Sequence, residues 1–302
     1  MLTEIISKAY DLGFIAIGFS HPERPLFIDE FKSWIDAGKN AGMSWLERNI
    51  NIREDPSKLL DKCKTIISLA YPYSSKKPAT NDGFTVSRYS RPDQEDYHRT
   101  TKDLCAELVT LIKSSYPNSH ARICVDSAPI MERSIGYSSG IGFIGKNNML
   151  IIPEYGSYFF LAEILTTSPL NIYDTEVIDN QCGDCSLCVD SCPTGALESP
   201  FRLDSSRCLS YLTIECKESP DKSWGRYMGE CFVGCDICQE VCPFNKEEKG
   251  RNICLPSTDE LLSMNNAIFK KLFGKTALSR PGLQKIKENI RILKDTRRNN
   301  PY

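Results

Sequence analysis

The sequence of 302 residues lacks any apolar run that approaches the roughly 18 residues expected of a membrane-spanning helix. Its start does not join a basic segment to an apolar one, so it does not resemble a secretory signal peptide. Internal repeats and low-complexity stretches are also lacking. With 41% apolar and 25% charged residues, the composition is globular and excludes disorder, collagen and coiled coil as the main organisation. We therefore expect a cytoplasmic protein without a membrane partner.

Two common nucleotide-binding motifs are lacking as well. Gly140, Gly142 and Gly145 satisfy the spacing G-x-G-x-x-G, but they lead into a predicted strand and not a helix, which argues against a dinucleotide-binding fold. The phosphate-binding pattern G-x4-G-K-[ST] fails at Asn147. The glycines are expected only to permit close approach of the backbone to a ligand.

Cysteine, in contrast, is abundant. The sequence contains 14 cysteines, which in a reducing compartment are not expected to form a disulfide framework. One run reads C-x2-C-x2-C-x3-C-P, and a second ends C-x2-C-x3-C-P with one further cysteine upstream. The two groups consist of Cys182, Cys185, Cys188 and Cys192, and of Cys208, Cys235, Cys238 and Cys242.

This spacing predicts two [4Fe–4S] clusters. Each cluster needs four thiolates, and the cysteine before proline binds the other cluster in two-cluster ferredoxins. The rule assigns Cys182, Cys185, Cys188 and Cys242 to one cluster, and Cys192, Cys208, Cys235 and Cys238 to the other. Two structural zinc sites are the alternative, because CxxC pairs also bind zinc. The spacing and both Cys–Pro endings favour iron–sulfur clusters, which would pass single electrons to a redox site elsewhere in the chain.

Three regions are predicted along the chain. Residues 1–170 alternate strand-like segments (14–18, 65–70, 121–125, 149–152 and 158–161) with helix-like ones (2–10 and 96–115), which predicts an α/β domain. Residues 171–254 form a two-cluster, ferredoxin-like domain, with a short helix expected after each Cys–Pro pair. Residues 255–302 are expected to form two helices, the first opened by a capping box at 257–260 and the second carrying an apolar stripe of Leu283, Ile286, Ile290 and Leu293.

The predicted tail is basic although the chain is not. The whole chain has a net charge of −2, whereas residues 255–302 contain ten Lys and Arg against four Asp and Glu. A basic segment on an acidic body suggests a polyanionic partner. A solvated helical face explains the same charges equally well.

A second candidate site surrounds Asp126, which follows the predicted strand at 121–125. On spacing alone, Asp126 or Ser127 is expected to cap a helix, with Pro129 in its first turn. The functional alternative is an acid at the carboxyl end of a strand, where α/β sheets place their sites.

Several segments together resemble one known family, the epoxyqueuosine reductases. The matching segments are 43–49, 53–56, 96–98, 126–133, 142–147, 153–157, 208–215, 234–239 and 242–245. The resemblance extends from residue 1 to about residue 295 and includes the long spacings to Cys208 and Cys235.

The resemblance implies a reaction and cofactors. The substrate would be epoxyqueuosine at the wobble position of a tRNA anticodon, and two electrons and two protons would remove the epoxide oxygen as water. The electrons would pass through the two clusters to a base-off cobalamin. Asp126 corresponds to the family's proton donor, and burial would have to raise its pKa for it to hold a proton near neutrality.

Further cobalamin contacts are implied by the matching motifs. Together with Asp126, they are Arg53, Tyr89, Lys146, Asn147, Ser157, Ser210 and Asp236. Surface solvation is the alternative for Arg53 and Lys146, and a helix cap is the alternative for Ser210. The sequence contains no Asp-x-His-x-x-Gly, so no histidine is expected to bind cobalt, and His21, His98 and His120 are expected to be ordinary residues.

The expected partners are the anticodon stem-loop of a tRNA and a low-potential electron donor such as flavodoxin or ferredoxin. The protein itself is expected to be a monomer. Many family members continue into a helical-repeat tail, so a chain that stops at Tyr302 resembles a short form. Three other functions remain open. They are a corrinoid iron–sulfur reductase of another substrate, similar to reductive dehalogenases but without their twin-arginine leader, a non-catalytic electron carrier, and a catalytically dead tRNA-binding module.

Overall fold

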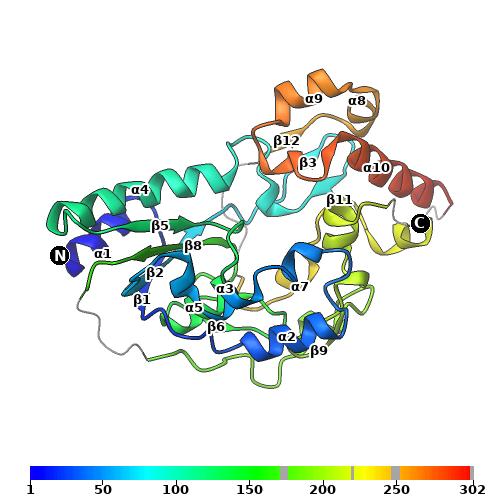
Figure 1. Ribbon diagram of the computed structural model, residues 1–302. Coiled ribbons are helices and arrows are strands. Elements are labelled where there is room, and N and C mark those ends of the chain that lie inside the picture. The colour runs from blue at the N-terminus through cyan, green and yellow to red at the C-terminus, as the bar shows by residue number, and fades with distance from the viewer. Residues whose placement is uncertain (171–175, 219–220, 246–251, 300–302) are drawn as a thin grey trace. The chain divides into compact units, whose positions relative to one another are not determined.

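A computed structural model describes residues 1–170, 176–218, 221–245 and 252–299 (Figure 1). The chain forms two compact units. The first contains residues 1–39, 44–73 and 98–185, and the second contains residues 40–43, 74–97 and 186–302. Segment 74–97 thus belongs with residues from the second half of the chain, and the basic tail belongs with most of the cysteines. The predicted borders at 170 and 254 stay predictions.

The first unit is built on an antiparallel sheet with the strand order β1-β2-β8-β5. Its strands are β1 (Ala16–Ser20), β2 (Thr65–Pro72), β8 (Phe159–Thr166) and β5 (Ala121–Cys124). A hairpin of β6 (Phe143–Ile144) and β7 (Leu150–Ile151) follows the glycine-rich segment. Each predicted strand is confirmed, with ends shifted by a few residues. The antiparallel order agrees with the exclusion of a dinucleotide-binding fold, which requires parallel strands.

Helices cover this sheet on both sides. They are α1 (Leu2–Asp11), α2 (Ile28–Asp36), α3 (Ile50–Glu54), α4 (Tyr97–Ser115) and α5 (Glu132–Ser138). Figure 1 shows α4 on one side of the sheet and α5 on the other. The helices predicted at 2–10 and 96–115 are confirmed as α1 and α4. Their buried side chains recur at helical spacing and supply the apolar faces that pack on the sheet.

The second unit contains short strands and short helices. Its strands are β3 (Ala79–Thr80), β4 (Thr85–Val86), β9 (Leu197–Ser199), β10 (Arg202–Leu203), β11 (Cys231–Val233) and β12 (Cys254–Leu255). Strands β11-β4-β3-β12 form one sheet in this order, and β9 pairs with β10. The short helices α6 (Leu187–Asp190) and α7 (Ile237–Glu240) precede Cys192 and Cys242. The prediction of helices after the Cys–Pro pairs is therefore wrong for the described residues. After Cys192 the chain turns at Gly195, whose φ of +62° does not continue a helix.

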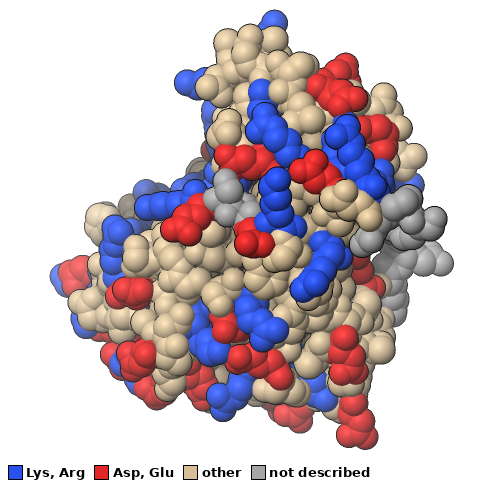
Figure 2. Space-filling model, turned by 90° about the vertical axis from the view of Figure 1, so that its right-hand side faces the viewer, with Lys and Arg blue, Asp and Glu red and all other residues tan. Residues whose placement is uncertain are grey.

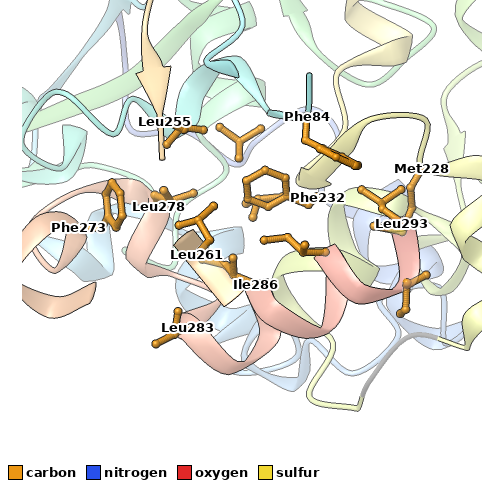
Figure 3. Packing of buried hydrophobic residues seen from close by; sticks show 14 of the residues in the cluster. Phe84, Met228, Phe232, Leu255, Leu261, Phe273, Leu278, Leu283, Ile286 and Leu293 are labelled. Atoms are coloured by element: carbon orange, nitrogen blue, oxygen red, sulfur yellow. The ribbon is translucent and has the colours of Figure 1, made fainter. Parts of the chain in front are cut away.

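The tail contains α8 (Thr258–Ser263), α9 (Asn266–Phe273) and α10 (Gly282–Asn299), so the prediction of two helices is wrong. Met264 is extended between α8 and α9, and the side chain of Asn265 caps α9 by accepting the Ile268 N–H. The capping box at Ser257–Glu260 is confirmed. The predicted apolar stripe of α10 is buried in one cluster with Phe84 and Phe232. Figure 3 shows three of its members, Leu283, Ile286 and Leu293, in this cluster. Among the described residues, no helix is both long and apolar enough to span a bilayer.

Candidate functional site

Asp126 lies just beyond the end of β5, in a left-handed backbone conformation with φ of +55°. Its N–H donates to Oε1 of Glu132 at 2.6 Å. Helix α5 begins only at Glu132, and its N-cap residue, Met131, makes no side-chain cap bond. The prediction of a helix cap at Asp126 or Ser127 is therefore wrong. Tight turns at Ser127 and Ile130 keep the intervening segment from becoming helical. Asp126 instead lies at the carboxyl end of a strand, as the functional alternative predicted.

The Asp126 carboxylate is paired with a histidine. Its Oδ2 lies 3.0 Å from Nε2 of His98, which comes from the first turn of α4. The Asp126 side chain is 59% exposed, so its expected burial against the corrin and apolar neighbours stays a prediction. Sequence reasoning missed His98 as a partner. Its place in the matching segment 96–98 was the available signal, but the two residues are 28 positions apart in the sequence, which leaves no local pattern.

Two further carboxyl groups, those of Glu132 and Glu163, interact with Asp126 directly or through each other. Burial, and next the charge of Asp126, raise the pKa of Glu132 to about 8. Glu163 on β8 is 0% exposed, and neither of its carboxylate oxygens has a hydrogen-bond partner among the described residues. Burial, and next the charge of Glu132, raise the pKa of Glu163 well above its usual range. Both groups therefore favour the protonated form near neutral pH. Glu132 lies in the matching segment 126–133, but its role was not predicted, and neither was that of Glu163.

Glu132 makes a pH-dependent contribution to stability. An acid whose pKa is higher in the folded state stabilises the fold fully below its unfolded pKa of 4.5, and loses this contribution as the pH rises through about 8. Glu132→Gln keeps an oxygen that accepts the Asp126 N–H but cannot ionise. We expect the variant to lose less stability than the wild type between pH 6 and pH 8.5, as measured by urea unfolding. Glu154→Gln, which alters an exposed carboxylate of the same unit, should leave the wild-type slope. Equal slopes for wild type and Glu132→Gln would contradict the assignment.

Arg53 supports the Asp126 segment from the inside. Its Nη1 donates to the carbonyl oxygen of Ile130 at 3.3 Å, and its guanidinium lies 5.5 Å from the centre of the Phe31 ring. Burial lowers the pKa of Arg53. Its Nε is buried and has no hydrogen-bond partner among the described residues. The alternative of surface solvation is wrong for Arg53, which offers one unsatisfied donor beside the Asp126 segment.

Lys146 and Asn147 lie in the turn between β6 and β7. Lys146 Nζ donates to the carbonyl oxygens of Gly183, at 2.6 Å, and Cys185, at 2.9 Å. It therefore holds the loop that carries Cys182 and Cys185, a role that the sequence did not indicate. Asn147 is buried, and its Oδ1 accepts the Met149 N–H at 3.2 Å. Ser157 is also buried.

The remaining predicted cobalamin contacts belong to the second unit. Tyr89 packs edge-on against Tyr97, with ring centres 6.5 Å apart. Asp236 is buried, and its Oδ2 accepts the backbone N–H of Arg88 at 2.8 Å and pairs with Arg88 Nη1 at 3.3 Å. Ser210 lies at the N-cap position of the helical turn Tyr211–Glu215, but its side chain makes no cap bond. Asp236 is thus engaged inside its own unit, and its proposed contact stays a prediction.

The structure brings one of the two predicted cysteine sets together within the second unit. Cys192, Cys208, Cys235 and Cys238 lie close enough that their charges interact. Burial, and next the neighbouring thiolates and Asp236, raise the pKa of Cys235 to about 12. Burial and neighbouring thiolates also raise the pKa values of Cys208 and Cys238. Grouped thiolates repel one another, and bound iron relieves this repulsion, so the donor set fits a cluster.

The other predicted cysteine set begins with a tight loop. Cys182, Cys185, Cys188 and Cys242 are half-buried. The N–H of Cys185 donates to the Cys182 carbonyl oxygen at 3.0 Å, which closes a tight loop. Among the described residues, no three His, Cys, Asp or Glu side chains are arranged to hold a single metal ion. A [4Fe–4S] cluster places its four thiolates on four different irons, so its ligands are spaced more widely.

Comparison with known proteins gives the family. Residues 53–127 match the family model described as epoxyqueuosine reductase QueG, DUF1730, and residues 181–245 match that of a 4Fe-4S double cluster binding domain. The chain is 35% identical over 307 residues to the epoxyqueuosine reductase of Cyclobacterium marinum, and the match covers 97% of each chain. The chain belongs to the epoxyqueuosine reductase family. The predicted resemblance and the predicted two-cluster domain are thereby confirmed.

Solved structures of the family confirm the predicted fold class. A crystal structure of epoxyqueuosine reductase with an epoxyqueuosine-modified tRNA-Tyr stem loop is 31% identical, with a TM-score of 0.85 over 97% of this chain and 80% of that one. The Bacillus subtilis family member, with its catalytic aspartate loop swung out of the active site, is 30% identical with a TM-score of 0.83. The assignment of individual ligands in this chain rests on its own residues and stays a prediction.

Proposed function

We propose that this protein is an oxidoreductase that reduces epoxyqueuosine to queuosine at the wobble position of tRNA. The reaction consumes two electrons and two protons, removes the epoxide oxygen as water, and leaves a carbon–carbon double bond. The pairing of Asp126 with His98 at the end of β5, in a chain with two cluster-binding cysteine sets, carries the proposal. The family members that match over most of this chain bear the name of this activity.

The electrons are proposed to pass through two [4Fe–4S] clusters. Cys192, Cys208, Cys235 and Cys238 would bind one cluster, and Cys182, Cys185, Cys188 and Cys242 the other. The interacting charges of the first of these sets support its assignment. The electron donor and the monomeric state stay predictions.

Cobalamin is the proposed electron-delivering cofactor. When bound, it supplies the low-potential electrons that open the strained epoxide ring. The buried, unsatisfied Nε of Arg53 supports such a ligand, because an unpaired buried donor is costly unless a ligand or water satisfies it. Arg53 and Asn147 would hold polar groups of the cofactor from the first unit, and Ser157 is a further proposed contact. Tyr89, Ser210 and Asp236 remain proposed contacts from the second unit, and Lys146 would have to leave its carbonyl partners to join them.

Asp126 is proposed to protonate the departing oxygen, because an unassisted alkoxide is a poor leaving group. Its Oδ2 shares a hydrogen bond with Nε2 of His98, so the imidazole can return a proton to Oδ2 after each transfer. Oε1 of Glu132 holds the backbone N–H of Asp126 and thereby orients the carboxylate. The exposed position of Asp126 leaves it accessible to a bound substrate, which would exclude water from the pair.

A bacterium that lacks its own epoxyqueuosine reductase provides the test. Its tRNA nucleosides would be analysed by mass spectrometry after this chain is supplied, with and without cobalamin in the medium. We expect epoxyqueuosine to be converted to queuosine only with cobalamin. Persistent epoxyqueuosine in cells that contain soluble protein with both clusters would contradict the proposal and favour another substrate or an electron carrier.

The basic tail is proposed to contact tRNA phosphates through a part of its charges. Part of its basic residues form ion pairs within the described chain, among them Arg280–Glu215, Lys294–Asp259 and Arg297–Glu230. On the face that Figure 2 shows, basic side chains stand among acidic ones. Lys270 and Lys271 on α9 are exposed and form no ion pair within the described part of the chain.

Reversing these two charges tests the phosphate contacts. We expect Lys270→Glu/Lys271→Glu to weaken tRNA binding and to lower the slope of log K against log salt by about two, or about one per lost contact. The measurement is a tRNA binding titration at several salt concentrations. Lys62→Glu/Lys113→Glu, a double charge reversal in the first unit, is the control. An unchanged salt slope in the α9 variant would rule out these contacts.

A further inference from the structure

Asn289 is an amide inside the apolar face of α10. It is 0% exposed and lies between Ile286 and Ile290 of the buried stripe. Its Nδ2 donates to the carbonyl oxygens of Phe232, at 2.8 Å, and Thr213, at 3.0 Å. Figure 3 shows the Phe232 ring packed over α10 near Ile286. Burial of an amide is unfavourable unless it is hydrogen-bonded, and its Oδ1 has no partner among the described residues. Asn289 therefore lowers the free energy of unfolding relative to an apolar residue at the same position.

Thr213 continues the same network toward the cysteines. It is buried in a single π-helical turn, Tyr211–Glu215, a rare conformation that is frequent at functional sites. Its Oγ1 donates to the carbonyl oxygen of Leu209 at 2.7 Å and accepts the N–H of Gly234 at 2.9 Å. Leu209 follows Cys208, and Gly234 precedes Cys235. The hydroxyl thus joins the two backbone segments next to two thiols of one proposed cluster.

Gly234 adds a steric limit at this point. Its φ is +80°, and a Cβ built there would lie 2.2 Å from Oγ of Ser87. The backbone before Cys235 is therefore confined on one side by Ser87 and held on the other by Thr213. Asn289 fixes the neighbouring carbonyl groups of Thr213 and Phe232. Neither Asn289 nor Thr213 belongs to any predicted ligand set, and no apolar residue could make these bonds.

We propose that Asn289 and Thr213 are positioning residues for the cluster bound by Cys192, Cys208, Cys235 and Cys238. By joining the Cys208 and Cys235 segments, they set how these two thiolates meet the iron, and so contribute to the reduction potential of this cluster. Reduction potentials of iron–sulfur clusters respond to hydrogen bonding and to the fixed geometry around the sulfurs. The inference rests on the two-cluster part of the proposed function, but not on the tRNA substrate.

The test uses the full chain with both clusters reconstituted without oxygen. Thr213→Val removes the hydroxyl at nearly constant volume, Thr213→Ser retains it, and Asn289→Leu removes both amide donors. Leu293→Ala is the control, because it weakens the packing of α10 without altering the network. Iron content, the electron paramagnetic resonance of the reduced clusters, and a redox titration are the readouts.

We expect Thr213→Val and Asn289→Leu to change the oxidation equilibrium of one cluster about tenfold, which is about 59 mV for a one-electron couple, and to leave the other unchanged. Thr213→Ser should restore the wild-type potential, and Leu293→Ala should lower stability without moving either potential. If Thr213→Val is insoluble, the potential of Asn289→Leu decides the test. This variant keeps both hydrogen bonds of the Thr213 hydroxyl and loses only the bonds from the amide to the carbonyl oxygens of Thr213 and Phe232.

Unchanged potentials and resonances in Thr213→Val and Asn289→Leu, with only reduced thermal stability, would show that the network serves packing alone and would overturn the inference. A wild-type protein that binds no clusters would instead overturn the proposed function. The two failures are therefore distinguishable.

Discussion

Asp126→Asn is expected to lower the rate of epoxyqueuosine reduction by about 10²- to 10⁴-fold, the usual contribution of a positioned general acid. Asparagine tolerates the left-handed backbone that Asp126 adopts, so the substitution removes the acid with little strain. The amide also fills the same space beside His98. The measurement is single-turnover conversion of epoxyqueuosine-containing tRNA by the reduced, cobalamin-loaded protein.

The controls separate chemistry from assembly. Asp126→Asn should retain the wild-type iron content, because no proposed cluster ligand lies near it in the sequence. It should also still bind cobalamin, because the amide keeps the size and polarity of the carboxyl group that it replaces. Asp103→Asn, which removes an exposed carboxylate from α4 of the same unit, should keep the wild-type rate. Near-normal turnover by Asp126→Asn would contradict the proton-donor role. An electron carrier without a substrate would also be indifferent to this substitution.

Cys208→Ala is expected to abolish turnover and to lower the iron content by about half, because one of two [4Fe–4S] clusters loses a thiolate. Cys208 is the most informative of the eight cysteines, since it stands alone in the sequence, distant from every CxxC pair. Its assignment to the set with Cys192, Cys235 and Cys238 is supported by the interaction of their charges. Iron analysis and the electron paramagnetic resonance of the reduced protein measure the outcome.

Cys254→Ser is the matched control for this experiment. Cys254 is exposed and lies outside both predicted ligand sets, so its removal should change neither the iron content nor turnover. Full iron content in Cys208→Ala would show that the upstream ligand was assigned wrongly. If the native protein contained zinc in place of iron, the alternative of two structural zinc sites would be correct.

Asp126→Asn and Cys208→Ala together also separate the alternative functions. An epoxyqueuosine reductase loses activity in both of these variants, although only Cys208→Ala loses a cluster. An iron–sulfur carrier would lose electron transfer in Cys208→Ala alone. A catalytically dead tRNA-binding module would bind tRNA equally well in both, and would convert no epoxyqueuosine even as the wild type.

The sequence by itself determined the features that depend on neighbours along the chain. The CxxC runs of the two cluster motifs, the capping box at Ser257 and the apolar stripe of α10 are local patterns, in which spacing fixes which side chains meet. The predicted strands and helices of the first unit followed for the same reason, with shifted ends. The errors arose where a turn interrupts the pattern, as at Asp126, Gly195 and Met264.

Only the tertiary structure decided which distant residues meet. His98 reaches Asp126, the charge of Glu132 acts on Glu163, and Asn289 bonds the carbonyl groups of Thr213 and Phe232. It also decided that the Asp126 carboxyl is exposed and that Arg53 is buried. Partners separated by tens of residues come together through sheet pairing and helix packing, so no local periodicity records them. Burial is likewise a property of the packed chain, which is why the pKa shifts of Glu132 and Glu163 could not be inferred from the sequence.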